Sequence, residues 1–388
     1  MRLPSVPIPG GTISLPRATA LGSLGLLLIV ADVLPENRYL DLDVAKFALS
    51  VALGLTALTI ALRDRLEASD LRVWSQRALL FVITVLGALG AAELMTRWAF
   101  RDVTTSSDYG GYFTRRWLRT NPIHKNAAGF RGPEFSATKP AGAYRIAIVG
   151  DSFTQGNGVR QEDRFSDLLD AMLPAHFEVL NFGVAGNNTP EHLEVVTTVL
   201  ANAHPDFVLL QWYVNDMEDD DTTGRPSFRP LVPVPSLHRW LTMESALYNV
   251  VNVPWSELQV TTGMTRSYPA YLYQRLGDPN GHDAAVDKRF LMAIIDRCRE
   301  ASVPLGIVLF PDTAAPIDRH YPFGYLHDRV LRTCRDHELT CVDLRDDFGL
   351  VKDHRQLWAS RLDHHPSARA HAIAAERILK TYAAKWAN

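Results

Sequence analysis

Hydrophobic positions follow two different patterns along the chain, and the change between them falls near residue 100. Three long apolar runs come first, at 18–34, 44–62 and 78–100. From about residue 143 onward, short apolar runs of strand length alternate with longer segments of helical period. The first pattern is typical of a membrane region, and the second of a parallel sheet with helices on both faces. We therefore predict a membrane region, an approach segment and an α/β domain, at 1–101, 102–142 and 143–388.

The three apolar runs predict three transmembrane helices. The second and third runs are long enough to cross the hydrocarbon core of a bilayer. The first run is shorter and has Asp32 near its end. A signal peptide is the alternative for this run, but no small-residue cleavage pattern precedes Pro35, which favours a membrane helix.

The loops between the runs predict the orientation in the membrane. The second loop carries four arginines, which are Arg63, Arg65, Arg72 and Arg77. The first loop has one arginine beside three acidic residues, namely Arg38 with Glu36, Asp41 and Asp43. The positive-inside rule then puts the N-terminus and the second loop in the cytoplasm. Three crossings then leave everything after Phe100, and so the α/β domain, on the outer side of the membrane. Near the outer end of the third run, Glu93 and Arg97 are spaced to pair on one helix face.

The apolar runs of the α/β domain predict five strands, at 144–149, 177–182, 206–213, 304–310 and 341–344. Helices are predicted at 190–203, 284–301, 322–337 and 366–386. Pro190 suits the first turn of its helix, and Thr189 or Asn188 can cap it. An insertion at 222–283, rich in Pro, Trp and Tyr, breaks the alternation. It is a lid, a contact surface or an ordinary helical excursion, and the pattern does not choose between them.

Composition narrows the function classes. The 388 residues are 47% hydrophobic and 21% charged, which fits one large domain with an extra module, or two domains. The net charge of −3 argues against a nucleic-acid partner, because phosphate binding needs a clustered basic surface. Three cysteines exclude a disulfide framework. Cys334 and Cys341 can still form one disulfide in an oxidising compartment, or they can remain two buried thiols.

Four polar stretches fall at the ends of predicted elements, at 150–152, 181–186, 214–216 and 363–366. A parallel sheet gathers such strand ends on one edge. Acyl transfer by a serine needs a base, a carboxylate that orients the base, and donors for the oxyanion. We assign Ser152 as the nucleophile, His365 as the base and Asp363 as the orienting acid. The backbone amides of Ser152 and Gly186 and the side-chain amide of Asn215 are the candidate oxyanion donors.

This ordered set of stretches resembles the SGNH, or GDSL-type, hydrolase family, whose blocks carry the catalytic serine, an oxyanion glycine, an oxyanion asparagine and an Asp/His pair. It is not the G-x-S-x-G elbow of the α/β-hydrolases, because Thr154 stands where that motif has glycine. The resemblance covers roughly 143–388 and implies a three-layer α/β/α, flavodoxin-like domain. The sequence Gly-Phe-Arg-Gly at 129–132 is similar to bacterial membrane-linked members of the family.

The sequence departs from the family pattern in two places. Tyr213 stands where the third block commonly has glycine, which narrows the pocket near Asn215 or only changes its shape. The last block has two consecutive histidines. His365 precedes Pro366 and so matches the position of the family's base, whereas His364 points away or touches the substrate.

The resemblance implies a membrane-anchored serine esterase or O-acyltransferase acting on an acylated glycan or lipid. A competing interpretation is a structural subunit of a large inner-membrane complex, photosynthetic, bioenergetic or glycan-exporting, whose hydrolase-like domain is a docking surface. The expected partners are the lipid bilayer, the acylated substrate and, because three spans offer lateral surface, other integral membrane proteins. No cofactor is expected. The acidic residues at 218–221 are interpreted as a solvated loop rather than a metal site.

Overall fold

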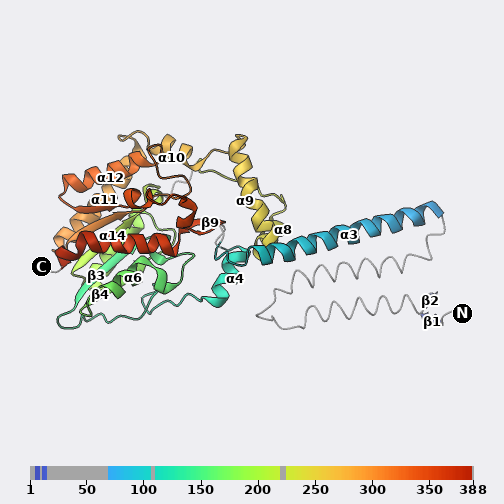
Figure 1. Ribbon diagram of the computed structural model, residues 1–388, viewed down its shortest axis with the longest axis horizontal. Helices are drawn as coiled ribbons and strands as arrows, with labels where there is room; N and C mark the ends of the chain where they lie inside the picture. Colours follow the sequence, from blue (N-terminus) through green and yellow to red (C-terminus); the bar gives the residue numbers. More distant parts are fainter. Residues whose placement is uncertain (1–4, 9–10, 15–68, 106–109, 219–223, 387–388) are drawn as a thin grey trace. The chain divides into compact units, whose positions relative to one another are not determined.

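The computed structural model describes residues 5–8, 11–14, 69–105, 110–218 and 224–386 (Figure 1). The chain forms two compact units. The first contains the residues up to Arg101 and the segment Val234–Val251, and the second contains Asp102–Pro233 and Asn252–Asn388. The predicted apolar runs 18–34 and 44–62 lie outside the described residues.

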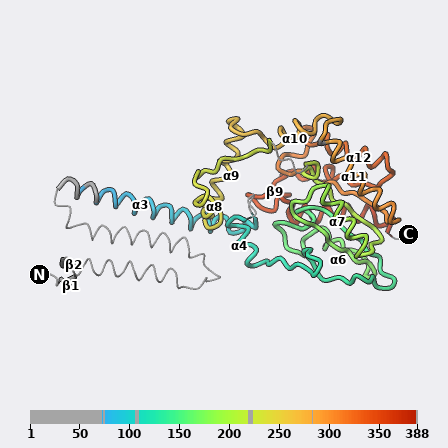
Figure 2. The backbone as a smooth tube through the Cα atoms, turned by 180° about the vertical axis from the view of Figure 1, so that it is seen from behind, coloured from blue at the N-terminus to red at the C-terminus, as the bar shows by residue number. Residues whose placement is uncertain are grey.

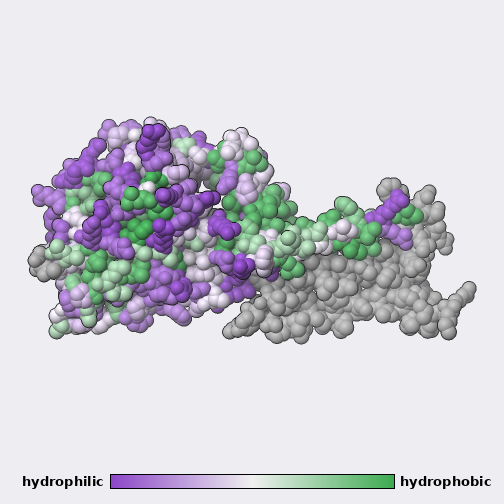
Figure 3. All heavy atoms as spheres, in the orientation of Figure 1, coloured by the Kyte–Doolittle hydropathy of each residue, from purple (hydrophilic) through white to green (hydrophobic). Residues whose placement is uncertain are grey.

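The third predicted apolar run forms one long helix in the first unit. This helix, α3 (Ser69–Ala99), has 31 residues, and its segment Gln76–Ala99 reaches a mean hydropathy of 2.2. Its apolar side chains are exposed, with 66% of Leu80, 69% of Phe81 and 70% of Met95 accessible. Figure 3 shows hydrophobic residues, in green, along α3. By length and composition, α3 is the one candidate membrane span among the residues that the structure describes.

The C-terminal end of α3 is tied to the turn between α8 (Pro235–Glu244) and α9 (Ala246–Thr261). Glu93 is buried there. Its carboxylate accepts hydrogen bonds of 2.7–2.9 Å from three groups at the start of α9, which are the Ser245 hydroxyl and the amides of Ala246 and Leu247. Arg97 Nε donates to Glu93 Oε1 at 2.7 Å, which confirms the predicted pair. Glu93 therefore satisfies helix-start amides that a capping side chain would otherwise bind.

Five parallel strands form the central sheet of the second unit. They are β3 (Tyr144–Gly150), β4 (Phe177–Gly183), β5 (Phe207–Trp212), β6 (Leu305–Leu309) and β7 (Thr340–Asp343). Their order is β4-β3-β5-β6-β7, so the prediction of a parallel-sheet α/β domain is confirmed, and each predicted strand overlaps an observed one. The strand order reverses at β3, because β4 lies on one side of it and β5 on the other. Open α/β sheets place ligand sites beyond the carboxyl ends of the strands at such a point.

Helices cover both faces of this sheet. Successive side chains of a strand point to opposite faces, so each face of the sheet has its own apolar residues to bury. Ala147 and Val149 of β3 pack into one hydrophobic cluster, whereas Ile146 and Ile148 pack into another. The first cluster includes residues of α7 (Thr189–Asn202), α10 (Tyr268–Leu276), α11 (His282–Glu300) and α12 (Gly324–Asp336). The second includes residues of α6 (Phe165–Met172) and α14 (Ala368–Trp386). Figure 1 shows α14 across one face of the sheet. Figure 2, which views the molecule from the other side, shows α7.

The remaining elements are short. They are β1 (Ser5–Ile8), β2 (Gly11–Ser14), α4 (Tyr112–Thr120), α5 (Ser152–Gln155), α13 (Arg345–Phe348), β8 (Trp358–Ser360), β9 (Asp363–Pro366) and the turns Gln161–Asp163, Val214–Met217 and His354–Leu357. Neither α6 nor the antiparallel hairpin of β8 and β9 was predicted from the hydrophobic pattern. The insertion 222–283 contains α8, α9 and α10, and Tyr271 of α10 belongs to the core of the second unit.

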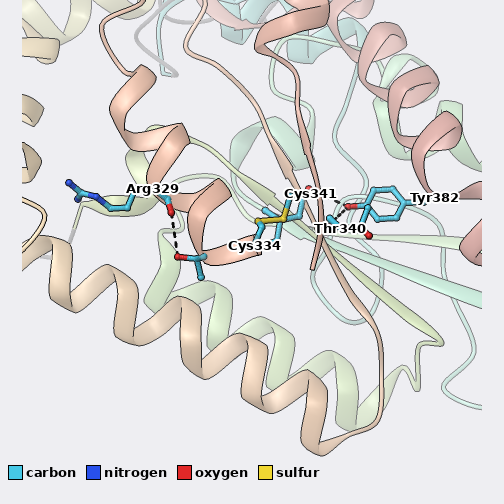
Figure 4. The surroundings of a disulfide bond; sticks show 7 residues. Arg329, Cys334, Thr340, Cys341 and Tyr382 are labelled. Atoms are coloured by element: carbon cyan, nitrogen blue, oxygen red, sulfur yellow. Dashed lines mark hydrogen bonds between the residues drawn. A yellow bond between two sulfur atoms is a disulfide. The ribbon is translucent and has the colours of Figure 1, made fainter. Parts of the chain in front are cut away.

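Cys334 of α12 and Cys341 of β7 form a disulfide (Figure 4). Their Cα atoms are 6.3 Å apart, within the usual span of such a bond. Of the two alternatives that the sequence left open, the bonded form is the one present. The Tyr382 hydroxyl of α14 donates a hydrogen bond of 2.6 Å to the Thr340 carbonyl (Figure 4). Strand β7, at the edge of the sheet, is thus linked to one helix on each face.

Candidate active site

Ser152 lies directly beyond the carboxyl end of β3, at the first position of α5. The turn before it requires glycine, because a Cβ on Gly150 would lie 2.2 Å from Thr154 Oγ1 and 2.4 Å from Gln211 Oε1. Gln211, from the neighbouring strand β5, accepts a hydrogen bond of 2.8 Å from the Thr154 hydroxyl. A buried polar contact between α5 and β5 therefore supports the turn that presents the serine.

Two buried aspartates hold the loops around Ser152 through backbone amides. Asp151 accepts a hydrogen bond of 2.8 Å from the Phe153 amide, and Asp216 accepts one of 3.0 Å from the Tyr213 amide. The other oxygen of Asp216 is 3.1 Å from His192 Nε2. Burial raises the pKa of Asp151 to about 6, with a further contribution from the negative charge of Asp216.

Ser152, His365 and Asp363 meet in one hydrogen-bonded array. His365 Nε2 is 3.0 Å from Ser152 Oγ, and His365 Nδ1 is 2.6 Å from Asp363 Oδ1. The His365 amide also donates to Asp363 Oδ1 at 3.1 Å. Asp363 and His365 both belong to β9, which lies far from Ser152 in the sequence. The array has the geometry of a nucleophile, a base and an orienting acid.

Electrostatics within the array favour these roles. Burial acts to lower the pKa of His365, but the hydrogen bond and negative charge of Asp363 outweigh it, and the pKa is raised. Burial acts to raise the pKa of Asp363, but its interactions with His365 dominate and lower it. Asp363 therefore remains a carboxylate at neutral pH, and the His365 imidazole is held with Nε2 toward the serine.

His364 points away from the array. Its side chain is exposed, and its ring centroid is 4.3 Å from that of Trp358 in the neighbouring strand β8. Adjacent residues of a strand point to opposite sides, so the extended segment separates the two histidines. Of the two histidines, the structure brings His365 to Ser152.

The loops that carry the predicted oxyanion donors flank β3. Gly186 follows β4 and has a left-handed φ of +89°, and Asn215 lies in the turn Val214–Met217 after β5. Because β4 and β5 both pair with β3 in parallel, their carboxyl ends lie beside the end that presents Ser152. The action of these groups as an oxyanion hole remains a prediction.

Tyr213, the departure from the family's glycine, packs beside the array. Its ring centroid is 4.3 Å from that of Phe153, which in turn lies 5.6 Å from the His365 ring, edge to face. The Tyr213 hydroxyl donates a hydrogen bond of 2.8 Å to Asp312. The residue thus forms part of an aromatic packing that contacts the imidazole.

The roles of two supporting residues near the site, Arg131 and Asn181, were not predicted from the sequence, although Asn181 begins the polar stretch 181–186. Arg131 is buried, and its guanidinium donates to the carbonyls of Gln155 at 3.1 Å and of Val159 at 3.0 Å, in the loop after Ser152. Asn181 donates to the Thr154 carbonyl at 2.6 Å. The Gly-Phe-Arg-Gly turn at 129–132 was the available signal for Arg131, although it was interpreted only as a family likeness.

Within the parts of the chain that the structure describes, no cluster of His, Cys, Asp and Glu side chains is arranged to hold a metal ion. Of the acidic residues at 218–221, only Glu218 is described. Its carboxylate lies 3.5 Å from the Arg225 guanidinium and accepts a hydrogen bond of 3.2 Å from the Tyr268 hydroxyl.

Comparison with solved structures finds partial similarity at low identity. A lipolytic protein of the G-D-S-L family from Veillonella parvula DSM 2008 is 14% identical, covering 62% of this chain and 99% of that chain, with a TM-score of 0.38. The acetyl xylan esterase AlAXEase is 16% identical, covering 61% and 98%, with a TM-score of 0.39. The psychrotrophic esterase EstA from Pseudoalteromonas sp. is 13% identical, covering 63% and 99%, with a TM-score of 0.36. No curated protein matches the chain.

Comparison with protein families gives a match over residues 148–373, to the GDSL-like lipase/acylhydrolase family. The match begins within β3 and ends within α14, so it covers more than half of the chain. It contains all four polar stretches, including Ser152, Asp363 and His365. The chain belongs to the GDSL-like lipase/acylhydrolase family.

Proposed function

We propose that this protein is a membrane-anchored serine esterase or O-acyltransferase whose catalytic residues are Ser152, His365 and Asp363. The observation that carries the proposal is the pair of contacts of His365, 3.0 Å to Ser152 Oγ and 2.6 Å to Asp363 Oδ1. A serine hydroxyl becomes an effective nucleophile when an adjacent base accepts its proton as it attacks. Membership of an acylhydrolase family supports the same chemistry.

In the first half of the reaction, Ser152 Oγ attacks the ester carbonyl while its proton passes to His365 Nε2. The resulting oxyanion is stabilised by the amides of Ser152 and Gly186 and by the Asn215 side chain. Asp363 stabilises the imidazolium, which then donates its proton to the leaving alkoxide as the ester bond breaks. An acyl group is left on Ser152.

In the second half, an acceptor hydroxyl attacks this acyl group while His365 takes its proton. Ser152 leaves and recovers a proton from His365, which regenerates the free site. Water as the acceptor gives a carboxylic acid, and a sugar hydroxyl gives a new ester. The same residues serve both outcomes, so the acceptor decides between hydrolysis and transfer.

The proposed location is the outer side of a bacterial inner membrane. The apolar helix α3 supports a membrane anchor, and the arginine-rich segment at 63–77 supports a cytoplasmic loop before it. The Cys334–Cys341 disulfide agrees with an oxidising compartment, because reducing conditions in the cytoplasm keep most thiols free. An anchored site meets acylated glycans and lipids of the envelope at high effective concentration, which supports them as the substrate class.

The proposal is tested with the full chain, purified in mild detergent and assayed on p-nitrophenyl acetate. We expect Ser152→Ala to abolish turnover without changing Tm. His364→Ala is the matched control from the same active-site segment, and we expect a loss of about tenfold at most. A fully active Ser152→Ala variant would exclude Ser152 as the nucleophile. A wild type that is inactive on all esters, and that co-purifies with integral membrane proteins, would favour the structural-subunit interpretation.

A further inference from the structure

The start of the approach segment, at residues 103–105, packs against the hairpin of β8 and β9, which carries Asp363 and His365. Thr104 Oγ1 donates a hydrogen bond of 3.2 Å to the Ala359 carbonyl in β8. The Ser360 hydroxyl donates to the Thr105 carbonyl. Ser360 is the register partner of Asp363 across the hairpin. We call Val103–Thr105 the strap, because it binds β8 next to the position of Asp363 on β9.

Thr105 also touches the loop that follows the nucleophile. A Cβ on Gly158 would lie 2.9 Å from Thr105 Oγ1 and 2.6 Å from the Ala359 side chain. Gly158 has a left-handed φ of +81°, so both its backbone and its surroundings exclude a larger residue. Thr105 therefore lies between the loop after Ser152 and the hairpin that carries Asp363.

The side-chain hydroxyl of Thr105 is buried and lacks a well-formed hydrogen bond within the described part of the chain. Thr105 is 1% exposed, and its Oγ1 makes no well-aligned hydrogen bond with any described residue. The hydroxyl is within reach of the Asp363 carboxylate, and its interaction there acts to lower the pKa of Asp363. Buried hydroxyls are nearly always hydrogen-bonded, and hydrogen bonds of catalytic groups often tighten only when substrate is bound.

We propose that Thr105 is a positioning residue, whose buried hydroxyl holds the Asp363 carboxylate in the orientation that places His365 against Ser152. The strap then belongs to the active site, although it lies well before the family match at 148–373. This inference rests on the proposed esterase function. It assigns to the approach segment a part in catalysis that its polar, irregular sequence did not indicate.

The test compares Thr105→Val, which keeps the side-chain shape but removes the hydroxyl, with Thr105→Ser, which keeps the hydroxyl. For Thr105→Val in the full chain we expect kcat to fall about tenfold with KM unchanged, because one hydrogen bond to a charged group is lost. We expect Thr105→Ser to restore most of kcat. Thr333→Val is the matched control, because it removes a buried threonine hydroxyl in α12 that donates a hydrogen bond to the Arg329 carbonyl instead.

The titration of His365, followed by NMR of its imidazole, gives a readout that does not need turnover. Asp363 raises the pKa of His365, so a displaced carboxylate in Thr105→Val should lower that pKa, whereas Thr333→Val should leave it unchanged. Equal kcat for wild type and Thr105→Val, or a His365 pKa that stays constant or rises, would overturn the positioning role. Wild type without esterase activity would overturn the proposed function instead, and the titration would still decide whether Thr105 orients Asp363.

Discussion

At the scale of single residues, the protonation of His365 decides whether the site can work. Only the neutral imidazole can accept the proton of Ser152. Burial alone would favour the neutral form, but Asp363 raises the pKa of His365 above its ordinary value of about 6.5. The carboxylate that orients the base therefore also makes the free site sensitive to mild acid.

The pH profile of kcat/KM tests this coupling. We expect activity to rise with pH through a midpoint above about 6.5, because His365 is protonated, and unable to act as the base, below its raised pKa. Asp363→Asn removes the negative charge, so the midpoint should move to lower pH while kcat/KM falls on the order of 10³–10⁴-fold. An acidic midpoint that is the same in both proteins would show that it does not report on His365.

The residues of the array could be predicted from the sequence because serine, histidine and aspartate appear in a recognisable order. The roles of Gln211 and Arg131 could not be predicted, because each depends on a partner distant in the sequence. Gln211 accepts a hydrogen bond from the Asp151 amide, 60 residues away. Arg131 donates one to the Gln155 carbonyl, 24 residues away. Each binds backbone groups, which every residue has. Nothing in the sequence therefore marks Gln211 as a support of the active site, and the Gly-Phe-Arg-Gly turn at 129–132 draws attention to Arg131 without showing what it binds.

At the scale of elements, prediction succeeded where burial dominates. The five central strands read as short apolar runs because both faces of a parallel sheet are covered. Asn188 caps α7, one of the two caps considered, through a capping box with Glu191. The hairpin of β8 and β9 gave no such signal, because the four residues of β9, Asp363–Pro366, are mostly polar. The hydrophobic pattern therefore does not mark that hairpin.

The disulfide between α12 and β7 is testable at this scale. It closes a loop across a sequence separation of 7, so the double variant Cys334→Ser/Cys341→Ser should lose about 2 kcal/mol of unfolding free energy. We expect a lower Tm and unchanged kcat, because the bond lies at the edge strand. A reducing agent should lower the Tm of the wild type in the same way and leave the double variant unaffected. No change in Tm for either treatment would contradict a stabilising bond.

At the scale of the whole molecule, the proposed orientation in the membrane determines which substrates the proposed site can meet. We expect protease added to intact spheroplasts to remove a C-terminal epitope tag, because the second unit is proposed to face outward. A cytoplasmic marker protein should stay intact in the same samples. Digestion of the tag only after lysis would reverse the orientation, and with it the proposed substrate class.

The division of the chain into units has a consequence for how such proteins diverge. The first unit takes Val234–Val251 from the middle of the sequence, and Glu93 provides the acceptor for the start of α9 there. A recombination event that replaced only residues 1–101 would delete Glu93 and leave the Ser245 hydroxyl and two helix-start amides without their acceptor. Helix α3 and the insertion are therefore expected to be inherited together, so that lineages lacking one also lack the other.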